Sequence, residues 1–442
     1  MSGNARSALM ILAVAGAAGS MAKAGCSTWV INPAPSNYVS GNSMCIADPD
    51  GPGGPLGSQL IIPNAFLSPA DEVSGGVGRW DGTNLTQFGP FSTGSVLSSV
   101  QYNGQLVLGG NFGPDTSVFS VVQGGGSSWT ALGNSGGETD SRAGDVGIYA
   151  LAVFNGNLVA GGAFDSIDGV TAHSIAVWNG TSWTTLGAGF DGTVRALAVY
   201  NNDLYAAGAF ANADGNPATN IAYFHAGSWH ALAGGVGGDH SYVSGPKVNA
   251  LAVYGGRLIV GGSFANANGA SALNIAAWNG SVWTGLGTGI DETDADFSPY
   301  GGVSSLAIVN NLLYAGGVMD QAGGVTVDGI AVWNGATWSG VGSASLDSGL
   351  GVGHLAALGV QAYQNKLVAA GFSFDDFSTF LATYTPCSCP ADFNNSGSVT
   401  VQDIFDFLTV WFARGPAADI NGSGTITVQD IFDFLAHWFA GC

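Results

Sequence analysis

Charged residues are scarce in this sequence. Asp, Glu, Lys and Arg make up 9% of its 442 residues, whereas about 25% is usual in globular domains. Only 9 residues are Lys or Arg and 30 are Asp or Glu, so the net charge is −21. A surface this acidic repels the phosphate backbone, which argues against a nucleic-acid partner. Hydrophobic residues still form 46% of the chain, so the composition is not that of a disordered acidic protein.

Long hydrophobic runs are absent as well. The apolar segment at residues 8–19 is shorter than the roughly 20 residues that a membrane-spanning helix needs. It follows the positive charge of Arg6 and precedes Ala22, Lys23 and Ala24, which have the small-residue spacing of a signal-peptide cleavage site. The sequence therefore predicts a signal peptide over residues 1–24, no membrane span, and a mature protein that is secreted or held at the cell surface.

Glycine, in contrast, is abundant, with 72 residues, and much of it belongs to an internal repeat. In each unit an apolar run such as ALAVY is followed by a turn dipeptide and by a second apolar run such as LYAGG, which contains Gly-Gly in most units. Two further short runs, such as IAVW and SWTTL, are joined by Asn-Gly. Asn-Gly suits tight hairpin turns, so each unit is predicted to be a four-stranded antiparallel meander with its first two strands buried on both faces. The leucine of the second run recurs at Leu60, Leu106, Leu158, Leu204, Leu258, Leu313 and Leu367.

These repeats resemble a β-propeller of the kelch or galactose-oxidase type, which implies an all-β fold over residues 25–386. Seven blades are favoured; the alternative is six, with the degenerate first unit as an extension. The seventh unit lacks a fourth strand, whereas Ser27, Thr28 and Trp29 look like the start of one. We therefore expect residues 27–31 to complete the seventh blade and remove a sheet edge. Closure of the ring would bring Cys26 near Cys387, where a disulfide can form, and a Cys26–Cys45 bond is the alternative.

The C-terminus repeats one stretch of sequence. Residues 392–403 and 419–430 are twelve-residue polar loops, each with Gly at position 6, and each is continued by IFDFL. Calcium takes six to eight oxygen ligands, and oxygens at positions 1, 3, 5, 7, 9 and 12 of such a loop supply them. The sequence therefore predicts two calcium sites. Their ligands are Asp392, Asn394, Ser396, Ser398, Thr400 and Asp403 in the first loop, and Asp419, Asn421, Ser423, Thr425, Thr427 and Asp430 in the second.

On these loops, residues 387–442 resemble a dockerin of the GC type, which implies a small α-helical domain with two calcium-binding loops. The resemblance also implies two equivalent binding faces for a cohesin-like partner or another cell-surface protein. Dockerins select their partner partly through loop positions 10 and 11, here Val401, Gln402, Val428 and Gln429. Ser396 and Ser423 stand where dockerins commonly have Asp, and the lower ligand charge implies weaker calcium binding. Cys389 and Cys442 flank the domain and could join its ends. The chain has five cysteines, an odd number, so one is free or pairs outside the chain.

Residues that would indicate catalysis are not recognisable. The sequence contains no G-x-S-x-G elbow, P-loop or H-E-x-x-H motif, and its histidines are predicted to be scattered and solvent-exposed: His173, His225, His230, His240, His354 and His437. The repeated tryptophans are predicted to pack between blades: Trp178, Trp183, Trp278, Trp283, Trp333 and Trp338. The favoured hypothesis is a non-catalytic exported propeller, with a protein or glycan ligand, attached through its calcium-binding tail. The alternative is a component of a polysaccharide-degrading complex whose propeller binds or hydrolyses glycans, and a third possibility is a tail that is removed after export.

Overall fold

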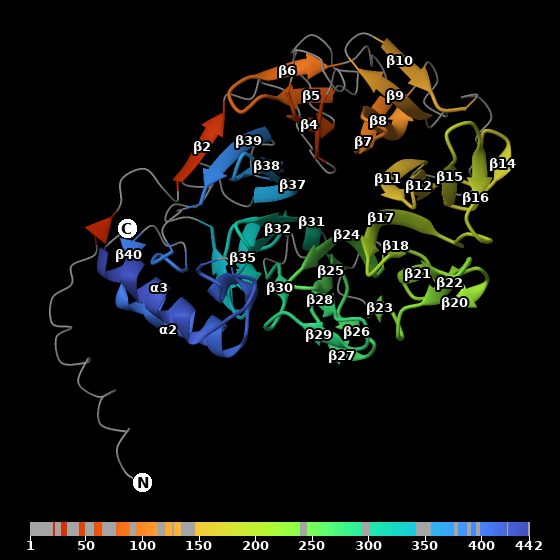
Figure 1. Ribbon diagram of the computed structural model, residues 1–442. Helices are drawn as coiled ribbons and strands as arrows, with labels where there is room; N and C mark the ends of the chain where they lie inside the picture. The colour runs from red at the N-terminus through yellow and green to blue at the C-terminus, as the bar shows by residue number, and fades with distance from the viewer. Residues whose placement is uncertain are drawn as a thin grey trace.

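A computed structural model of the chain describes residues 21–22, 28–32, 44–48, 57–63, 77–88, 94–112, 120–125, 128–133, 146–238, 245–293, 301–341, 355–374, 379–386, 390–394, 398–421 and 423–440. In these residues the fold is a ring of antiparallel sheets with a pair of helices beside it (Figure 1). It is a β-propeller followed by a small helical domain, as the sequence predicts. None of the described helices is long and apolar enough to cross a membrane.

The described strands form seven four-stranded blades, the last two of which are joined by a single pairing of Val318 with Ala356. In chain order the blades contain β3 (Cys45–Ala47), β4 (Gln59–Pro63), β5 (Val77–Trp80) and β6 (Leu85–Phe88); β7 (Gly94–Tyr102), β8 (Gln105–Phe112), β9 (Ser120–Gly125) and β10 (Ser128–Ala131); β11 (Gly147–Phe154), β12 (Asn157–Ala163), β15 (Ile175–Trp178) and β16 (Trp183–Thr185); β17 (Thr193–Tyr200), β18 (Asp203–Ala209), β21 (Ile221–His225) and β22 (Ser228–Ala231); β24 (Lys247–Tyr254), β25 (Arg257–Ser263), β28 (Ile275–Trp278) and β29 (Trp283–Gly285); β31 (Gly302–Val309), β32 (Leu312–Val318), β35 (Ile330–Trp333) and β36 (Trp338–Gly340); and β37 (Leu355–Tyr363), β38 (Lys366–Ser373), β39 (Thr379–Thr385) and β2 (Thr28–Asn32).

The N-terminal strand β2 closes the ring. It pairs antiparallel with β39, from Thr28 opposite Thr385 to Asn32 opposite Leu381, and so becomes the fourth strand of the seventh blade (Figure 1). This confirms the closing strand predicted at residues 27–31, displaced by one residue. The first repeat unit forms a complete blade of β3 to β6, so the six-bladed alternative is wrong.

The tryptophan of the fourth strand ties each of several blades to the preceding one. The indole N–H groups of Trp183, Trp229 and Trp338 donate to the carbonyl oxygens of Leu132, Leu186 and Leu286, at 2.7, 2.8 and 2.9 Å. In the seventh blade Trp29 does the same, donating to Val341 O at 3.1 Å. The six repeated tryptophans are all buried, which confirms that they belong to the packing between blades.

The first two strands of a blade differ in burial. The second strand β32 is buried along its whole length, but in the first strand β11 buried and half-buried residues are mixed. Burial on both faces, as predicted for both strands, therefore holds for the second strand and is wrong for the first. The physical reason is position, because side chains of the first strand line a cavity at the centre of the ring.

The Gly-Gly pair of the second strand allows close contact between backbones. A Cβ atom added to Gly162 would lie 2.1 Å from the carbonyl oxygen of Gly147, and one added to Gly262 would lie 2.1 Å from that of Lys247. Opposite the glycines the first strand carries a β-bulge, for example between Ile148 and Ala150. The glycines are therefore required by backbone proximity.

Four small hairpins inserted after the second strand were not predicted. They occur in the third to sixth blades and are formed by β13 (Ser166–Ile167) with β14 (Val170–Thr171), β19 (Asn212–Ala213) with β20 (Asn216–Pro217), β26 (Asn266–Ala267) with β27 (Ala270–Ser271), and β33 (Gln321–Ala322) with β34 (Val325–Thr326). Two further short strands, β23 (Val236–Gly237) and β30 (Ile290–Asp291), pair with β26 and β33.

Among the five cysteines the structure describes Cys45, which carries a free thiol. This contradicts the alternative disulfide between Cys26 and Cys45. The other cysteines, Cys26, Cys387, Cys389 and Cys442, lie outside the described residues, as does most of the predicted signal peptide. The short strand β1 (Met21–Ala22) pairs with β40 (Ser398–Val399) in the C-terminal domain.

Candidate metal-binding and docking site

The C-terminal domain is built around two helices, α2 (Val401–Phe412) and α3 (Val428–Ala440), joined through a short 3-10 helix at Pro416–Ala418. Phe407 of α2 and Phe434 of α3 are fully buried, and their rings stack with centroids 4.2 Å apart and planes 1° apart. Phe393 contacts both rings edge-on, at 5.4 and 6.0 Å. The two copies of the helix therefore pack face to face through equivalent residues.

Each helix also closes the loop of the other copy. The indole N–H of Trp411 in α2 donates to Thr427 O in the second loop, at 2.8 Å. The indole N–H of Trp438 in α3 donates to Thr400 O in the first loop, at 2.9 Å. The duplicated sequence thus produces a domain with internal two-fold symmetry.

In the first loop the carboxylate at position 12 caps its own helix. Asp403 is fully buried, and its Oδ2 accepts hydrogen bonds from the Thr400 backbone N–H at 2.8 Å and the Thr400 hydroxyl at 3.0 Å. Its Oδ1 accepts from the backbone N–H of Asn394 at 3.2 Å. Asp392 at position 1 is also buried. Ser396 and the side chain of Ser398 lie outside the described residues.

The second loop is folded by the same kind of hydrogen bonds. Asp419 at position 1 accepts from the backbone N–H groups of Ser423 at 2.9 Å and Gly424 at 2.7 Å. Asp430 at position 12 is fully buried and accepts from the backbone N–H groups of Thr427 at 2.7 Å and Ile420 at 3.1 Å. Backbone N–H groups of the loop therefore hold both carboxylates in place.

The third position of each loop points toward a helix. The Asn421 amide donates to Asp433 Oδ2 at 2.8 Å, and the equivalent Asn394 amide donates to Asp406 Oδ2 at 2.9 Å. Hydrogen bonds from Asn421 and then Gln429 lower the pKa of Asp433 below its usual value. Asp433 therefore remains ionised at mildly acidic pH and adds negative charge beside the second loop.

The donor set of these loops has the chemistry of a calcium site. It consists of oxygens from carboxylates, amides and hydroxyls, which a hard cation prefers. A carboxylate oxygen that accepts one N–H keeps a second lone pair for a cation. In the described residues no group of three or more Asp, Glu, His or Cys side chains lies close enough together to hold a metal, so a cation here would depend on amide, hydroxyl and backbone oxygens as well.

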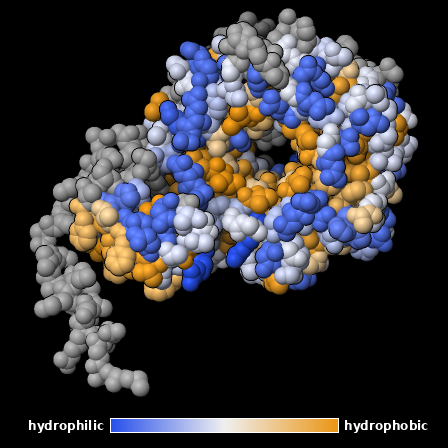
Figure 2. Space-filling model, in the orientation of Figure 1, coloured by the Kyte–Doolittle hydropathy of each residue, from blue (hydrophilic) through white to orange (hydrophobic). Residues whose placement is uncertain are grey.

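A stripe of aromatic residues remains exposed on each helix. In α2 the exposed fractions are 59% for Phe405 and 74% for Phe412, and in α3 they are 62% for Phe432 and 73% for Phe439. These positions, with the exposed residues Val401 and Val428, share one side of each helix because residues 4 and 11 positions apart lie close to the same face. We call these two sets the α2 stripe (Val401, Phe405, Phe412) and the α3 stripe (Val428, Phe432, Phe439). Hydrophobic residues gather on the visible surface of this domain in Figure 2.

The four residues predicted to select a partner lie on this exposed part of the domain. Val401 and Val428 begin the two stripes. Gln402 and Gln429 are exposed, but their amides donate to Asp406 and Asp433, each at 2.9 Å. The large exposed phenylalanines were not singled out from the sequence, because a helix that is apolar around most of its circumference does not reveal which side faces solvent.

The helical domain sits against the ring with its stripes exposed. A Cβ atom added to Gly335, in the turn between β35 and β36, would lie 3.1 Å from the Gly415 Cα. Ala336 packs on the core of the helical domain, and α2 lies beside β35 in Figure 1. The contact with the propeller therefore uses the turn after α2.

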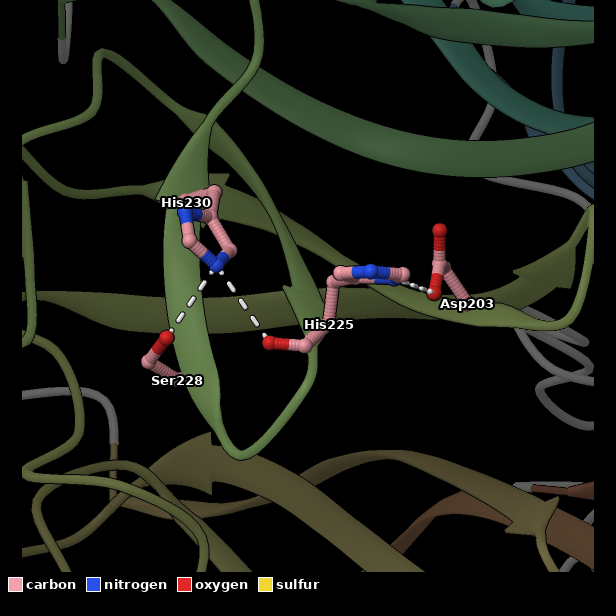
Figure 3. A network of polar contacts seen from close by, with 4 residues as sticks. All are labelled: Asp203, His225, Ser228 and His230. Atoms are coloured by element: carbon pink, nitrogen blue, oxygen red, sulfur yellow. Dashed lines mark hydrogen bonds and ion pairs between the residues drawn. The ribbon is translucent and has the colours of Figure 1, made fainter.

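A second polar cluster lies on the fourth blade (Figure 3). His225 Nδ1 contacts Asp203 Oδ1 at 2.8 Å, whereas His230 Nε2 contacts the Ser228 hydroxyl at 3.1 Å and His225 O at 3.3 Å. Serine, histidine and aspartate are thus present together, but the aspartate and the serine contact different imidazoles. The cluster does not have the arrangement of a hydrolytic triad, in which one imidazole bridges both. Sequence reasoning missed it because Asp203 is 22 residues from His225.

No family model matches this sequence, and no curated protein matches it. Solved structures that match include the WD40 β-propeller domain of Doa1, at 12% identity and a TM-score of 0.44, covering 81% of this chain and 96% of that one. A chain of the Mitotic Checkpoint Complex matches at 13% identity and a TM-score of 0.45, covering 82% and 93%. The structure of YjhT matches at 14% identity and a TM-score of 0.35, covering 64% and 92%.

Proposed function

We propose that this protein is an exported, non-catalytic β-propeller that is attached to a protein partner through its C-terminal domain, at the cell surface or in an extracellular assembly. The observation that carries the proposal is the pair of symmetric stripes on α2 and α3. Four phenylalanines that are more than half exposed on one small domain form an apolar surface that a monomeric domain rarely leaves uncovered.

The energetics suit a docking surface. Full burial of a phenylalanine side chain is worth about 1.5–3 kcal/mol, so a partner that covers one stripe removes two such side chains from water. The domain also carries six Asp and one Arg in residues 387–442. The partner that fits is therefore a protein with an apolar groove and basic residues around its rim.

Calcium would organise the loops that support these helices. The first site would use Asp392, Asn394, Ser396, Ser398, Thr400 and Asp403, and the second Asp419, Asn421, Ser423, Thr425, Thr427 and Asp430. When bound, calcium supplies positive charge that offsets the buried carboxylates, of which Asp403 and Asp430 are fully buried. Each loop has two carboxylates rather than three, so we expect weak affinity.

The proposal is tested with the full-length protein as bait on the surface fraction of the producing cells, in calcium and in chelator. One variant carries Phe405→Ser and Phe412→Ser, a second carries Phe432→Ser and Phe439→Ser, and a third carries all four changes. Because the two stripes are equivalent and used one at a time, each half-variant should bind within about twofold of the wild type. The fourfold variant should lose capture of the same partner.

The matched control is Val253→Ser, which removes an exposed hydrophobic residue from the propeller and should leave capture unchanged. Asp403→Ala with Asp430→Ala should abolish capture in calcium if the loops must be filled. Capture of the partner by the fourfold variant would refute docking through the stripes, whereas equal capture in chelator would refute only the role of calcium. A glycan-binding and hydrolysis screen of the same protein separates this proposal from the alternative of a polysaccharide-degrading component.

A further inference from the structure

The first strands of the blades share one sequence motif, in which one position changes far more than the others. The motif reads Val-x-Ala-Leu-Ala-Val-Tyr or a close variant, and its second residue is Tyr149 in β11, Arg195 in β17, Asn249 in β24 and Ser304 in β31. The remaining positions stay small or apolar because they pack within and between blades. The side chain at the variable position is therefore not constrained by this packing.

The structure explains where these side chains go. The variable residue is the extra residue of a β-bulge in each strand, between Ile148 and Ala150, Val194 and Ala196, Val248 and Ala250, and Val303 and Ser305. A bulge redirects the side chain of its extra residue. All four line one cavity of about 250 Å³ at the centre of the ring. Figure 2 shows the ring hollowed at its centre.

The charge of this cavity is opposite to that of the protein. Arg195 is the one charged residue on its described wall, and no carboxylate lines it, although the chain has a net charge of −21. The guanidinium carbon of Arg195 lies 5.0 Å from the ring centroid of Tyr149, in a cation–π contact that holds the group in place. A contact through the flat face of a guanidinium is compatible with hydrogen bonding through its N–H edge.

The rest of the wall combines apolar and neutral polar groups. Ala and Leu residues of the motif, such as Leu197 and Leu251, supply the apolar part, and Ser304 and Gln361 supply polar atoms. The Asn249 amide donates to Val303 O at 3.0 Å, which fixes its side chain. A cavity of about 250 Å³ has room for several water molecules or for one small organic molecule.

We propose that this cavity binds a small organic monocarboxylate, whose carboxylate pairs with Arg195 and whose body contacts the Ala and Leu wall. A planar guanidinium matches a carboxylate through two parallel hydrogen bonds, and the low charge of the surroundings strengthens that pair. One arginine balances one negative charge, so a monocarboxylate fits this site better than inorganic phosphate, which carries more charge. This ligand is independent of the partner proposed for the helical domain.

The test is an NMR binding screen of the full-length protein against a fragment library of carboxylic acids, each matched with its primary amide and accompanied by inorganic phosphate. The acids should be enriched among the binders, and for the best acid Arg195→Gln should weaken binding at least about tenfold, the loss of one charge-assisted hydrogen-bond pair. Arg257→Gln is the matched control, because it makes the same change of charge on an exposed residue of β25, outside the cavity wall. It should leave binding unchanged.

A second variant covers the case in which Arg195→Gln does not fold. Ser304→Leu places a larger side chain at a position on the cavity wall and leaves Arg195 itself unchanged. The equivalent bulge of β7, between Val96 and Ser98, already carries Leu97, so the backbone there accepts a leucine. This variant should fold and should weaken binding of the best acid. Equal binding of acids and amides, tighter binding of phosphate, or unchanged affinity in Ser304→Leu would overturn the proposal.

Discussion

The rings of Phe407 and Phe434 stack in parallel at 4.2 Å, on the axis that relates the two copies of the C-terminal loop and helix. Each ring therefore packs on the equivalent residue of the other helix. The stack lies at the centre of a very small core, which Phe393, Val410 and Ala418 complete. The first prediction follows from this arrangement.

Phe407→Ala should destabilise the helical domain by about 3–5 kcal/mol, because it leaves a cavity against Phe434. By symmetry Phe434→Ala should have a similar effect. Thermal unfolding followed by near-UV circular dichroism in calcium buffer would measure both. Phe412→Ala is the control, since this residue is 74% exposed and its loss should cost under about 0.5 kcal/mol. A large difference between the two core variants would contradict the symmetric packing.

Gly162→Ala should destabilise the third blade, because the new methyl group would lie 2.1 Å from the Gly147 carbonyl oxygen and the backbone of β11 would have to move. Overpacking of this kind costs about 1–3 kcal/mol or more. Chemical denaturation of the full-length protein would measure the loss. Gly57→Ala is the matched control, because among the described residues no atom beyond its chain neighbours lies within 4 Å of its added Cβ. Equal stability of the two variants would refute the close backbone contact.

Trp29→Ala should weaken the closure of the ring. The side chain donates to Val341 O at 3.1 Å and packs on the ring of Tyr384 with centroids 5.1 Å apart. Loss of one hydrogen bond and one aromatic pair should lower the free energy of unfolding by about 2 kcal/mol. Val30→Ala, at an exposed position of the same strand, should have little effect. Hydrogen exchange of β39 should rise in the first variant, and unchanged protection of β39 would argue against this role of Trp29.

Cys45 should react slowly with iodoacetamide until the solution is strongly alkaline. Burial raises the pKa of its thiol to about 11, and a hydrogen bond with Ser99 offsets this only in part. The pKa is higher in the folded state, so the stability contributed by the protonated thiol is present below pH 9.0 and is lost as the pH rises toward 11. Peptide mapping of alkylated protein at a series of pH values would measure this, with urea-unfolded protein as the reference. Similar rates in the two samples at pH 9 would contradict the raised pKa of this half-buried residue.

Much of the fold could be predicted because the repeat encodes it locally. Asn-Gly turns, the tryptophans and the Gly-Gly pair recur in most units, so their roles could be assigned from their spacing. The incomplete seventh unit and the sequence Ser27-Thr28-Trp29 likewise predicted the closing strand. The symmetry of the C-terminal domain could be predicted from its duplicated sequence. The hydrogen bonds of Trp411 and Trp438, each to the loop of the other copy, have this symmetry.

The remaining features depend on distances that a sequence does not contain. Strands of two residues, such as β13 and β14, are too short to give a periodic pattern. The contact of Asp203 with His225 joins two strands of a blade, and no motif marks it. Phe405 is exposed and Phe407 is buried although they are two positions apart in the same largely apolar helix, because only the packing of α2 on α3 distinguishes them.

Closure by β2 also sets an order for folding. Trp29 and the carbonyl of Val341 are 312 positions apart, so the seventh blade is finished only after the first and last parts of the propeller meet. Contacts of such long range slow the folding of β proteins. A nascent chain must therefore leave β2, which is synthesised first, unpaired and open to aggregation until β39 has been made.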